Sequence, residues 1–473
     1  MQISLAKIIE VLGGATVVAP SQAERVVEQI VWDSRAVTDG CAFLAIKGER
    51  VDGNSFIGQA LSAGAALAIA CDEPGEAACE KARLLGAGIV RVEDPCDALR
   101  ALAGYVRSTL TATVVGISGS SGKTTTKNMI AHVLSAEFAT VATKANQNNE
   151  LGVPATVLNA SEATEALVVE MGMRGFGQLE SLCEFVRPGI GVLTNIGTAH
   201  AELLGSQENI ARAKAELIAA LPAGGTAVLN GDDPFTPFVR EVAGCDERGV
   251  DVLLYGTGEE CSVRATDIEF SRIGRPTFSI TFPNGRSTRV ELPLMGMHNV
   301  LNALAAAAVG YACDMPIERI ANALRTVEGQ SMRQELVEAG DGVIVINDAY
   351  NANPDSMRAA LSLLSMMDAG AGRKIAVLGD MGELGADEVA DHRGVGEAAA
   401  ACGPDLLVTI GELGAHIAAG AVDAGMPADH VVACADVPQA VRAIEGARVP
   451  DSIILVKASR FMELERVVEE LIG

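Results

Sequence analysis

One segment, residues 114–126 with the sequence VVGISGSSGKTTT, restricts the fold of this chain more than any other. It reads as an apolar strand, a glycine-rich turn and a helix that continues through Leu134. Glycines at such a turn let backbone N–H groups point at phosphate oxygens beside the positive end of the helix dipole. Lys123 adds a cationic charge, and the Thr124 hydroxyl suits Mg²⁺. The segment predicts a phosphate-binding loop in an α/β fold, with these nucleotide-contacting residues: Gly119, Ser120, Ser121, Gly122, Lys123, Thr124 and Thr125.

The spacing of this loop differs from the strict Walker pattern. That pattern needs glycine at position 117, where the chain has Ile117, and Gly116 stands one residue earlier. A glycine turn with a purely structural role is therefore the alternative. The strand before the turn and the helix after it favour the nucleotide.

Length and strand–helix rhythm predict three domains, since 473 residues at about 150 residues per domain give roughly three. Residues 1–108 alternate short strands and helices and form a small α/β domain. Residues 109–327 repeat an apolar strand followed by a helix, which indicates βαβ units around a mostly parallel sheet. Its strands are expected at 113–117, 166–170, 191–195 and 226–230.

Two further segments complete this organisation. Residues 261–294 alternate polar and apolar side chains around an Asn-Gly turn at Asn284, which predicts a β insertion against the main sheet. Residues 328–473 again alternate strands and helices, as in a doubly wound Rossmann-like fold. Its strands are expected at 343–346, 374–378, 406–410, 430–434 and 453–456.

Charge and apolar patterning exclude several classes of protein. With 36 basic and 61 acidic residues the formal net charge is −25, so attraction to nucleic acid or an anionic membrane is not expected. The longest apolar stretch, residues 301–313, is shorter than the ~20 residues of a membrane span. Residues 1–13 lack the pattern of a signal peptide. The ten cysteines show neither zinc nor disulfide spacing, so we expect reduced thiols and a cytoplasmic protein.

Three residues downstream of the loop are candidates for metal chemistry. Glu170 ends an apolar strand, where open α/β sheets place ligands. His200 follows another strand and a turn, and Lys214 lies in a helical stretch. Taken singly, each has a plainer interpretation: a solvated carboxylate, a loop histidine and a surface lysine.

Together these residues resemble the Mur ligases, ATP-dependent enzymes that form amide bonds in peptidoglycan synthesis. The family's loop is Gly-x-x-Gly-Lys-Thr, here 119–124, which accounts for the departure from Walker spacing. The resemblance implies that Glu170 and His200 bind Mg²⁺, in addition to the Thr124 hydroxyl of the loop. It also implies that Lys214, fourteen residues after His200, is carbamylated and becomes an anionic ligand, so that two Mg²⁺ ions are expected.

The resemblance extends to the rest of the ATP site. The segment GMHNVLN at 296–302 is similar to the family's adenine-side segment, with Asn299 and Asn302 as the matching asparagines. Arg333 matches an arginine that acts on the phosphates, and Asp348 matches an acidic residue that holds the ribose hydroxyls. Lys123, Glu170, His200, Lys214 and Arg333 are then the residues expected to support catalysis.

Within the family, residues 347–357, NDAYNANPDSM, look like the type that adds D-alanyl-D-alanine to a UDP-N-acetylmuramoyl-tripeptide. The implied mechanism passes through an acyl phosphate and releases ADP and phosphate, and closure of the domains excludes water. We expect a monomer with the UDP-sugar on residues 1–108, ATP on 109–327 and the dipeptide on 328–473. The expected substrate-binding residues are Ser34, Arg35, Asn146, Asn149, Tyr350, Asn351, Asn353, Lys457, Ser459 and Arg460.

The sequence is compatible with several alternatives. Ala458 stands where the family has glycine and would be strained if that position had a positive φ. A folylpolyglutamate synthase would share the loop and the metal residues, and a P-loop switch or ATPase would share the loop alone. The sequence does not distinguish lysine from diaminopimelate as the third residue of the substrate peptide, and it identifies no general base.

Overall fold

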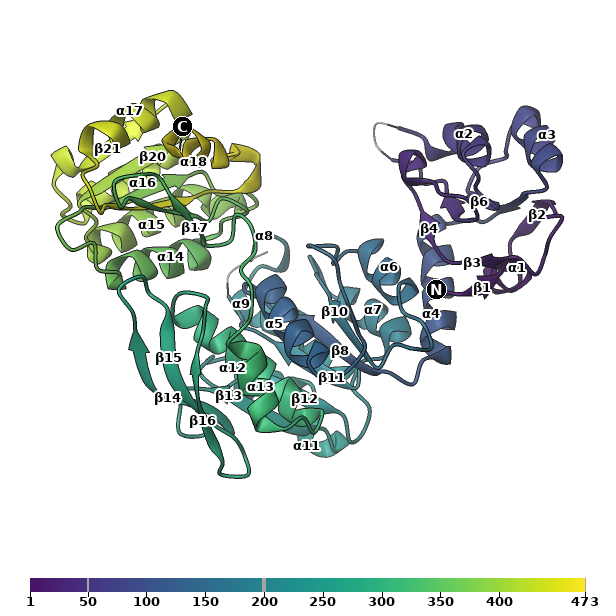
Figure 1. Cartoon of the computed structure of the whole chain (residues 1–473), viewed down its shortest axis with the longest axis horizontal. Coiled ribbons are helices and arrows are strands. Elements are labelled where there is room, and N and C mark those ends of the chain that lie inside the picture. The colour runs from purple at the N-terminus through teal and green to yellow at the C-terminus, as the bar shows by residue number, and fades with distance from the viewer. Residues whose placement is uncertain (49–50, 198–200, 473) are drawn as a thin grey trace.

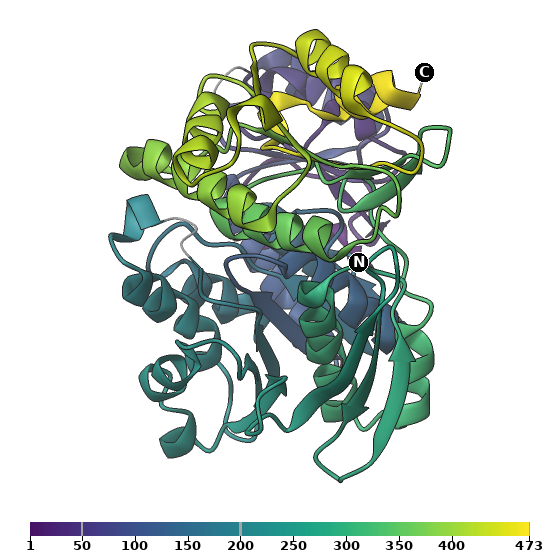
Figure 2. The same ribbon diagram turned by 90° about the vertical axis from the view of Figure 1, so that its left-hand side faces the viewer.

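The computed structural model describes residues 1–48, 51–197 and 201–472. Each of three α/β domains is built around its own sheet, as predicted. The N-terminal and C-terminal domains lie at opposite ends of the molecule and the central domain joins them (Figure 1). Turned by 90°, the molecule shows the C-terminal domain stacked on the central one (Figure 2). In the part of the chain that is described, no helix is long and apolar enough to cross a membrane.

The N-terminal domain has a five-stranded sheet in the order β2-β7-β6-β5-β4 and a separate β1–β3 pair. Only β2 runs antiparallel to its neighbour in the larger sheet. Helix α4 packs against α6 and α7 of the central domain and so connects the two domains. The elements are β1 (Ile3–Ser4), α1 (Leu5–Leu12), β2 (Ala15–Val18), β3 (Val26–Val27), β4 (Ile30–Val31), β5 (Ala42–Leu44), α2 (Ile57–Ser62), β6 (Leu67–Ala70), α3 (Glu76–Leu85), β7 (Gly88–Arg91) and α4 (Pro95–Thr109).

The central domain contains a nine-stranded sheet in the order β16-β15-β14-β13-β12-β11-β8-β10-β9. From β9 to β14 the neighbouring strands are parallel. The elements are β8 (Thr113–Ser118), α5 (Lys123–Ser135), β9 (Thr140–Ala142), α6 (Gly152–Leu158), β10 (Ala166–Glu170), α7 (Gln178–Val186), β11 (Ile190–Leu193), α8 (Ala201–Leu204), α9 (Gln207–Ala219), β12 (Thr226–Asn230), α10 (Thr236–Val242), α11 (Cys245–Arg248), β13 (Asp251–Gly256), β14 (Val263–Phe270), β15 (Pro276–Thr281), β16 (Ser287–Glu291), α12 (Met297–Ala312) and α13 (Ile317–Leu324).

Helices cover both faces of this sheet, and successive side chains of each strand point to opposite faces, so each strand contributes to two cores. Val114 of β8 packs into a core that includes α4, α7 and α9. Its neighbour Val115 packs into a second core with α5, α12 and α13. Strand β8 is an interior strand, third from the β9 edge, and the loop that follows it lies at the carboxyl ends of the parallel strands.

The predicted β insertion is present but is continuous with the main sheet. Strand β14 pairs with β13, and β15 and β16 add antiparallel to it. Gly285 has a φ of 77° at the turn between β15 and β16, as the Asn-Gly pair at 284–285 predicts. The insertion therefore extends the edge of the sheet.

The C-terminal domain is doubly wound, with strand order β17-β18-β22-β19-β20-β21 and only β17 antiparallel. Helices α14, α15 and α16 supply the core on one face of the sheet, and α17 and α18 supply it on the other. The elements are β17 (Glu335–Glu338), β18 (Ile344–Asn347), α14 (Pro354–Met366), β19 (Lys374–Gly379), α15 (Glu388–Cys402), β20 (Leu406–Ile410), α16 (Gly414–Asp423), β21 (Val431–Cys434), α17 (Val437–Ala447), β22 (Ile453–Lys457) and α18 (Glu465–Ile472).

Candidate active site

The phosphate-binding loop connects β8 to α5, where the sequence predicts it. Gly119 has a φ of 151°, and a Cβ at that position would lie 1.8 Å from Thr194 Oγ1. Gly122 has a φ of 74° and precedes the first residue of α5, whose N-terminus has no side-chain cap. Uncapped N–H groups at a helix N-terminus suit an anion. Glycine is needed twice here, once for space and once for the left-handed backbone.

Two residues of the neighbouring strand end brace this loop. Asn195 Oδ1 accepts a hydrogen bond from the Ser121 N–H at 2.9 Å, and Asn195 Nδ2 donates to Ser121 Oγ at 2.7 Å. Thr194 Oγ1 donates to the Ser121 carbonyl at 2.6 Å. Neither residue was predicted from the sequence, although their position directly after β11 places them at the same sheet edge.

Lys123 is folded back onto its own loop. Its Nζ donates to the carbonyls of Gly119 at 2.8 Å and Ser120 at 3.3 Å. Burial lowers the pKa of the Lys123 ammonium, and the nearby Glu170 carboxylate opposes that shift. The ammonium thus lies at the loop where phosphate oxygens would be bound.

Glu170 ends β10 and is buried, with 1% of its surface exposed. Its Oε1 accepts hydrogen bonds from Thr124 Oγ1 at 3.1 Å and Asn148 Nδ2 at 2.8 Å. Its Oε2 is buried and has no hydrogen-bond partner among the described residues. An unpaired carboxylate oxygen beside a hydroxyl is a donor set that suits Mg²⁺.

The other two residues predicted to bind a metal are Lys214 and His200. Lys214 is buried on α9, and burial, followed by the charge of Lys123, lowers its pKa well below the usual value. In the described part of the chain its ammonium has no ion-pair partner, and it is not on the cavity wall. His200 lies outside the described residues. Across residues 1–48, 51–197 and 201–472, no cluster of three His, Cys, Asp or Glu side chains forms a ready metal site.

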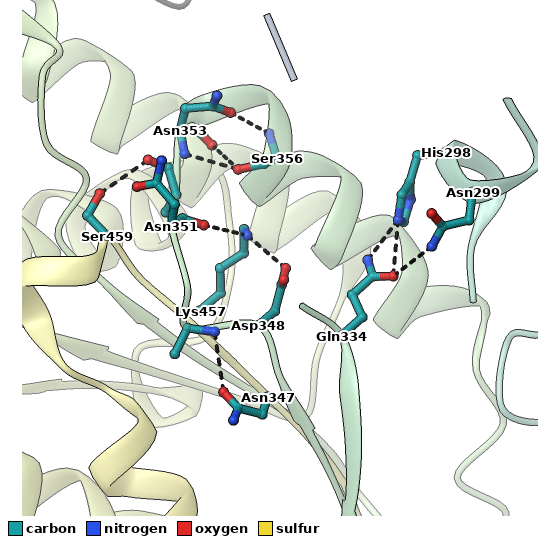
Figure 3. Close-up of polar contacts among 12 residues, drawn as sticks. His298, Asn299, Gln334, Asn347, Asp348, Asn351, Asn353, Ser356, Lys457 and Ser459 are labelled. Carbon is teal, nitrogen blue, oxygen red and sulfur yellow. Dashed lines mark hydrogen bonds and ion pairs between the residues drawn. The ribbon is translucent and has the colours of Figure 1, made fainter. Parts of the chain in front are cut away.

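At the start of α12 the two predicted asparagines form one chain of hydrogen bonds. Thr126 Oγ1 donates to Asn302 Oδ1, and Asn302 Nδ2 donates to Asn299 Oδ1, both at 3.0 Å. Asn299 Nδ2 donates to the Met295 carbonyl at 2.8 Å. It also donates to Gln334 Oε1 at 3.2 Å (Figure 3). Both asparagines are buried beside the phosphate loop.

The sequence did not predict a role at the site for Gln334 or His298. Gln334 Nε2 and His298 Nε2 lie 2.8 Å apart, and burial lowers the pKa of His298 (Figure 3). Gln334 and Met332 both have positive φ values, 56° and 57°, in the connection between the central and C-terminal domains. Beside them the Arg333 guanidinium lies over the Tyr350 ring at 4.1 Å from its centroid. This connecting segment therefore contributes directly to the site.

Asp348 and Lys457 form a buried ion pair at the ends of β18 and β22. Lys457 Nζ lies 2.7 Å from Asp348 Oδ2 and donates to the Asn351 carbonyl at 3.0 Å (Figure 3). Lys457 is only 3% exposed. The predicted ribose-binding carboxylate is thus linked to the segment predicted to bind the dipeptide.

The remaining dipeptide-side residues have structural partners. Asn353 caps α14, with its Oδ1 accepting from the Ser356 N–H at 2.8 Å (Figure 3). Ser459 Oγ donates to the Ala352 carbonyl at 3.2 Å, and Arg460 pairs with Glu465 at 2.6 Å. Ala458 is not among the residues with positive φ, so the strain considered for it is absent.

One cavity of about 330 Å³ brings most of these residues together. Its wall combines the phosphate loop, the ends of β10 and β11, the start of α12, the connecting segment and the start of α14. The predicted residues on the wall are Ser120, Ser121, Gly122, Lys123, Thr124, Thr125, Asn146, Glu170, Asn299, Asn302, Arg333, Asp348, Tyr350, Asn351, Asn353 and Lys457. The central and C-terminal domains therefore build a single site.

Several predicted residues are not on this wall. Asn149 Oδ1 accepts a hydrogen bond from the N–H of Gly152, the first residue of α6, at 3.0 Å. Its neighbour Asn148 contacts Glu170 instead. Ser34 and Arg35 lie in the N-terminal domain, where Arg35 pairs with Asp33 at 2.7 Å and is 86% exposed. That guanidinium lowers the pKa of Asp33 to about 2. Gly119, Lys214, Ser459 and Arg460 are also absent from the wall.

A phosphate-binding loop on a parallel sheet, facing a Rossmann-like domain across a shared cavity, defines a multidomain nucleotide-dependent enzyme. Comparison with protein families makes this specific. Residues 26–105 match the Mur ligase family catalytic domain, residues 117–310 the Mur ligase middle domain and residues 332–460 the Mur ligase glutamate ligase domain. The chain belongs to the Mur ligase family.

Two relatives that are named as the same ligase match along 97–100% of the chain. The UDP-N-acetylmuramoyl-tripeptide–D-alanyl-D-alanine ligase of Mycobacterium tuberculosis is 37% identical, with 100% of this chain and 98% of the relative covered. The enzyme of the same name from Bacillus subtilis is 36% identical, with 97% of this chain and 96% of the relative covered. The resemblance thus covers all three domains.

Solved structures agree. A crystal structure of MurF from Acinetobacter baumannii superimposes with a TM-score of 0.88 at 30% identity, covering 100% of this chain and 99% of that one. MurF ligase from Thermotoga maritima in complex with ADP gives a TM-score of 0.81 at 27% identity, covering 94% and 97%. Folylpolyglutamate synthase from Mycobacterium tuberculosis, at 19% identity and a TM-score of 0.62, covers 80% of this chain and 94% of its own and shares the fold alone.

Proposed function

We propose that this chain joins D-alanyl-D-alanine to UDP-N-acetylmuramoyl-tripeptide at the expense of ATP, which gives the UDP-N-acetylmuramoyl-pentapeptide of peptidoglycan synthesis. The observation that supports this most directly is the single cavity shared by the phosphate loop, Glu170 and the 348–353 segment. Relatives matched along the whole chain are named for the same reaction. The folylpolyglutamate synthase alternative has only the fold in its favour.

The reaction needs two bond-forming steps. The tripeptide carboxylate attacks the γ-phosphorus of ATP, which forms an acyl phosphate and releases ADP. The dipeptide amine then attacks the acyl carbon, passes through a tetrahedral intermediate and expels phosphate as it loses a proton. No enzyme nucleophile is required, so the protein acts by positioning and by neutralising charge. Lys123, the N–H groups of residues 119–125 and Arg333 are the groups that serve the phosphates, and no residue is assigned as the base.

The metal-binding residues fit a hard cation. Glu170 Oε2 is buried without a partner, and the Thr124 hydroxyl contacts the same carboxylate. Mg²⁺ supplies charge neutralisation at the phosphates when bound. We assign Thr124, Glu170, His200 and the modified Lys214 as its ligands, for two ions in all.

Lys214 is suited to carbamylation by its environment. Burial lowers the pKa of its amine, which favours the neutral form that attacks CO₂. The ammonium first loses a proton, and the neutral amine then forms an N–C bond to CO₂ and releases a second proton, so that a cation becomes a carbamate anion. The product resembles a carboxylate, and Mg²⁺ binds oxygen anions.

The remaining assignments concern the residues that bind the nucleoside, the peptide substrates and the UDP-sugar, and the boundaries of the domains. Asn299 and Asn302 hold adenine and Asp348 the ribose. Asn146, Asn149, Tyr350, Asn351, Asn353, Lys457, Ser459 and Arg460 serve the peptide substrates, and Ser34 and Arg35 the UDP-sugar. The three domains divide at 108 and 327, and their closure excludes water from the acyl phosphate. The protein acts as a monomer in the cytoplasm, where ATP is available.

The test is a ligase assay with purified protein, ATP, Mg²⁺ and D-alanyl-D-alanine, run separately with the lysine and the diaminopimelate UDP-tripeptide. We expect pentapeptide and phosphate in equal amounts, with phosphate release dependent on the dipeptide. Phosphate release that does not need the dipeptide, without pentapeptide, would favour an ATPase or a switch. Product formed with folate and glutamate in place of these substrates would favour the folate ligase.

A further inference from the structure

Lys127 is a buried cation to which the reaction above gives no role. It lies on α5, three residues after Thr124, and only 1% of its surface is exposed. Its Nζ donates to the carbonyls of Thr143 at 2.6 Å and Ala145 at 3.2 Å. Among the described residues no carboxylate lies within ion-pair distance of it. Burying an ammonium that is paired only with carbonyls costs free energy of desolvation. We therefore expect the contacts of Lys127 to serve a role that offsets this cost.

Those carbonyls begin the loop at 143–149 that connects β9 to α6. Ala145 has a φ of 48°, in the left-handed region that alanine rarely occupies. The bond from Lys127 to the Ala145 carbonyl therefore holds the backbone at its least favourable residue. Released from that bond, the loop would relax toward an ordinary conformation.

The same loop holds Glu170 at two points. Thr143 Oγ1 accepts from the Glu170 N–H at 2.9 Å, and Asn148 Nδ2 donates to Glu170 Oε1 at 2.8 Å. The Asn148 carbonyl accepts from the Gly172 N–H at 2.8 Å, which fixes the far end of the loop beside β10. With Oε1 engaged, Oε2 is the oxygen left without a partner.

We propose that Lys127 is a positioning residue for the metal-binding carboxylate: it fixes the 143–149 loop so that Asn148 orients Glu170 with Oε2 available to a divalent cation. This rests on the proposed role of Glu170. Groups that orient a metal ligand from behind commonly change metal affinity about 10- to 100-fold when removed.

If Lys127 acted only through its charge, its removal would change the affinity for the cation in the opposite direction. The Lys127 charge is close enough to Glu170 for each to influence the other, since the carboxylate opposes the burial that lowers the pKa of Lys127. If charge alone mattered, removing the ammonium would strengthen cation binding. If Lys127 positions the loop, removing it weakens cation binding.

The experiment measures Mn²⁺ binding to the full chain in the presence of ADP, by the electron paramagnetic resonance signal of free Mn²⁺. Lys127→Met removes the charge and the donor with little change in shape. Lys127→Gln keeps a shorter donor without the charge. Lys144→Met is the matched control, because it removes a lysine charge from the same loop where the side chain is exposed. We expect the Mn²⁺ dissociation constant to rise about tenfold or more for Lys127→Met, about threefold for Lys127→Gln and less than twofold for Lys144→Met.

Asn148→Ala tests the second step independently. It should reproduce the loss in Mn²⁺ affinity, and adding Lys127→Gln to it should weaken binding little further, because both act through one contact. Unchanged or tighter Mn²⁺ binding in Lys127→Gln overturns the proposal, and this variant decides the matter if Lys127→Met does not fold. A wild-type protein that binds Mn²⁺ and ADP but makes no pentapeptide would refute the proposed function and leave this comparison intact.

Discussion

At the residue scale, three lysines in or near the site have surroundings that differ from those of an ordinary solvated lysine. Lys123 turns back onto loop carbonyls, Lys457 pairs with Asp348 inside the protein, and Lys214 has neither arrangement among the described residues. A lysine buried without a carboxylate loses its proton more easily. Of the three, Lys214 is the one whose environment favours a covalent change of charge.

We therefore predict that Lys214→Ala lowers the ligase rate about 10²- to 10³-fold, as removal of one preorganised electrostatic group does. Short carboxylic acids should partly restore it by occupying the place of the carbamate. Lys214→Arg, which keeps a cation, should be equally inactive and should not be rescued. Steady-state rates with and without acetate or formate measure this, and full activity of untreated Lys214→Ala would exclude the carbamate.

Wild-type activity should also depend on dissolved CO₂. Carbamate formation consumes the neutral amine and releases a proton, so lower pH and CO₂-free buffer both favour the free lysine. The lowered pKa of Lys214 keeps more neutral amine available near neutral pH than an exposed lysine would have. Bicarbonate added at constant pH should restore the rate.

At the element scale, the strand ends and helix starts determine which side chains meet. Strands β8, β10 and β11 are adjacent and parallel, so Ser118, Glu170 and Leu193 end at one edge and the residues after them converge. Helix α14 begins at the same cavity, and Asn353 forms a capping box with Ser356. A residue predicted to bind substrate thus also starts a helix.

Asn353→Ala should remove the cap and destabilise the first turn of α14 by about 1 kcal/mol, which corresponds to about fivefold faster amide exchange there. Asn353→Asp keeps a cap oxygen and should retain the protection. Hydrogen–deuterium exchange of the amides of residues 355–358 measures both. Equal loss of protection in the two variants would mean that the capping oxygen is not what holds this turn. If the Asn353 amide also binds the dipeptide, Asn353→Asp should stay protected while its KM for the dipeptide rises.

At the scale of the whole molecule, the central and C-terminal domains meet around the cavity. A Cβ at Gly197 would lie 2.3 Å from Asp355 Oδ2, so the loop after β11 closely approaches the start of α14. Farther along, Arg174 after β10 pairs with Glu383 after β19 at 3.4 Å, and both side chains are 70% exposed. These contacts join loops that belong to different domains.

Because an exposed ion pair is worth at most about 1 kcal/mol, we expect Arg174→Glu to lower kcat/KM by no more than about fivefold. The loss should shrink at high salt, which screens exposed charges. Exchanging the two charges, Arg174→Glu with Glu383→Arg, should restore most of the activity. A loss that is insensitive to salt, or that the exchange does not repair, would show that this pair does not assist the approach of the domains.

The chain order of apolar and polar residues determined much of this protein by itself. The GSSGKT turn, the strand–helix rhythm and the three-domain fold follow from local pattern, because phosphate loops and buried parallel strands have strong local requirements. The family resemblance located Glu170, Asn299, Asn302, Arg333 and Asp348, and the structure places all five on one cavity wall.

Only the tertiary structure decided which neighbours hold those groups. Asn148 rather than Asn149 contacts Glu170, Gln334 contacts Asn299, and Lys127 supports the loop behind the carboxylate. Such contacts join residues far apart in the chain, and their direction depends on backbone angles and burial that no local spacing encodes. The sequence determined which chemical groups are available, and packing determined which of them face one another.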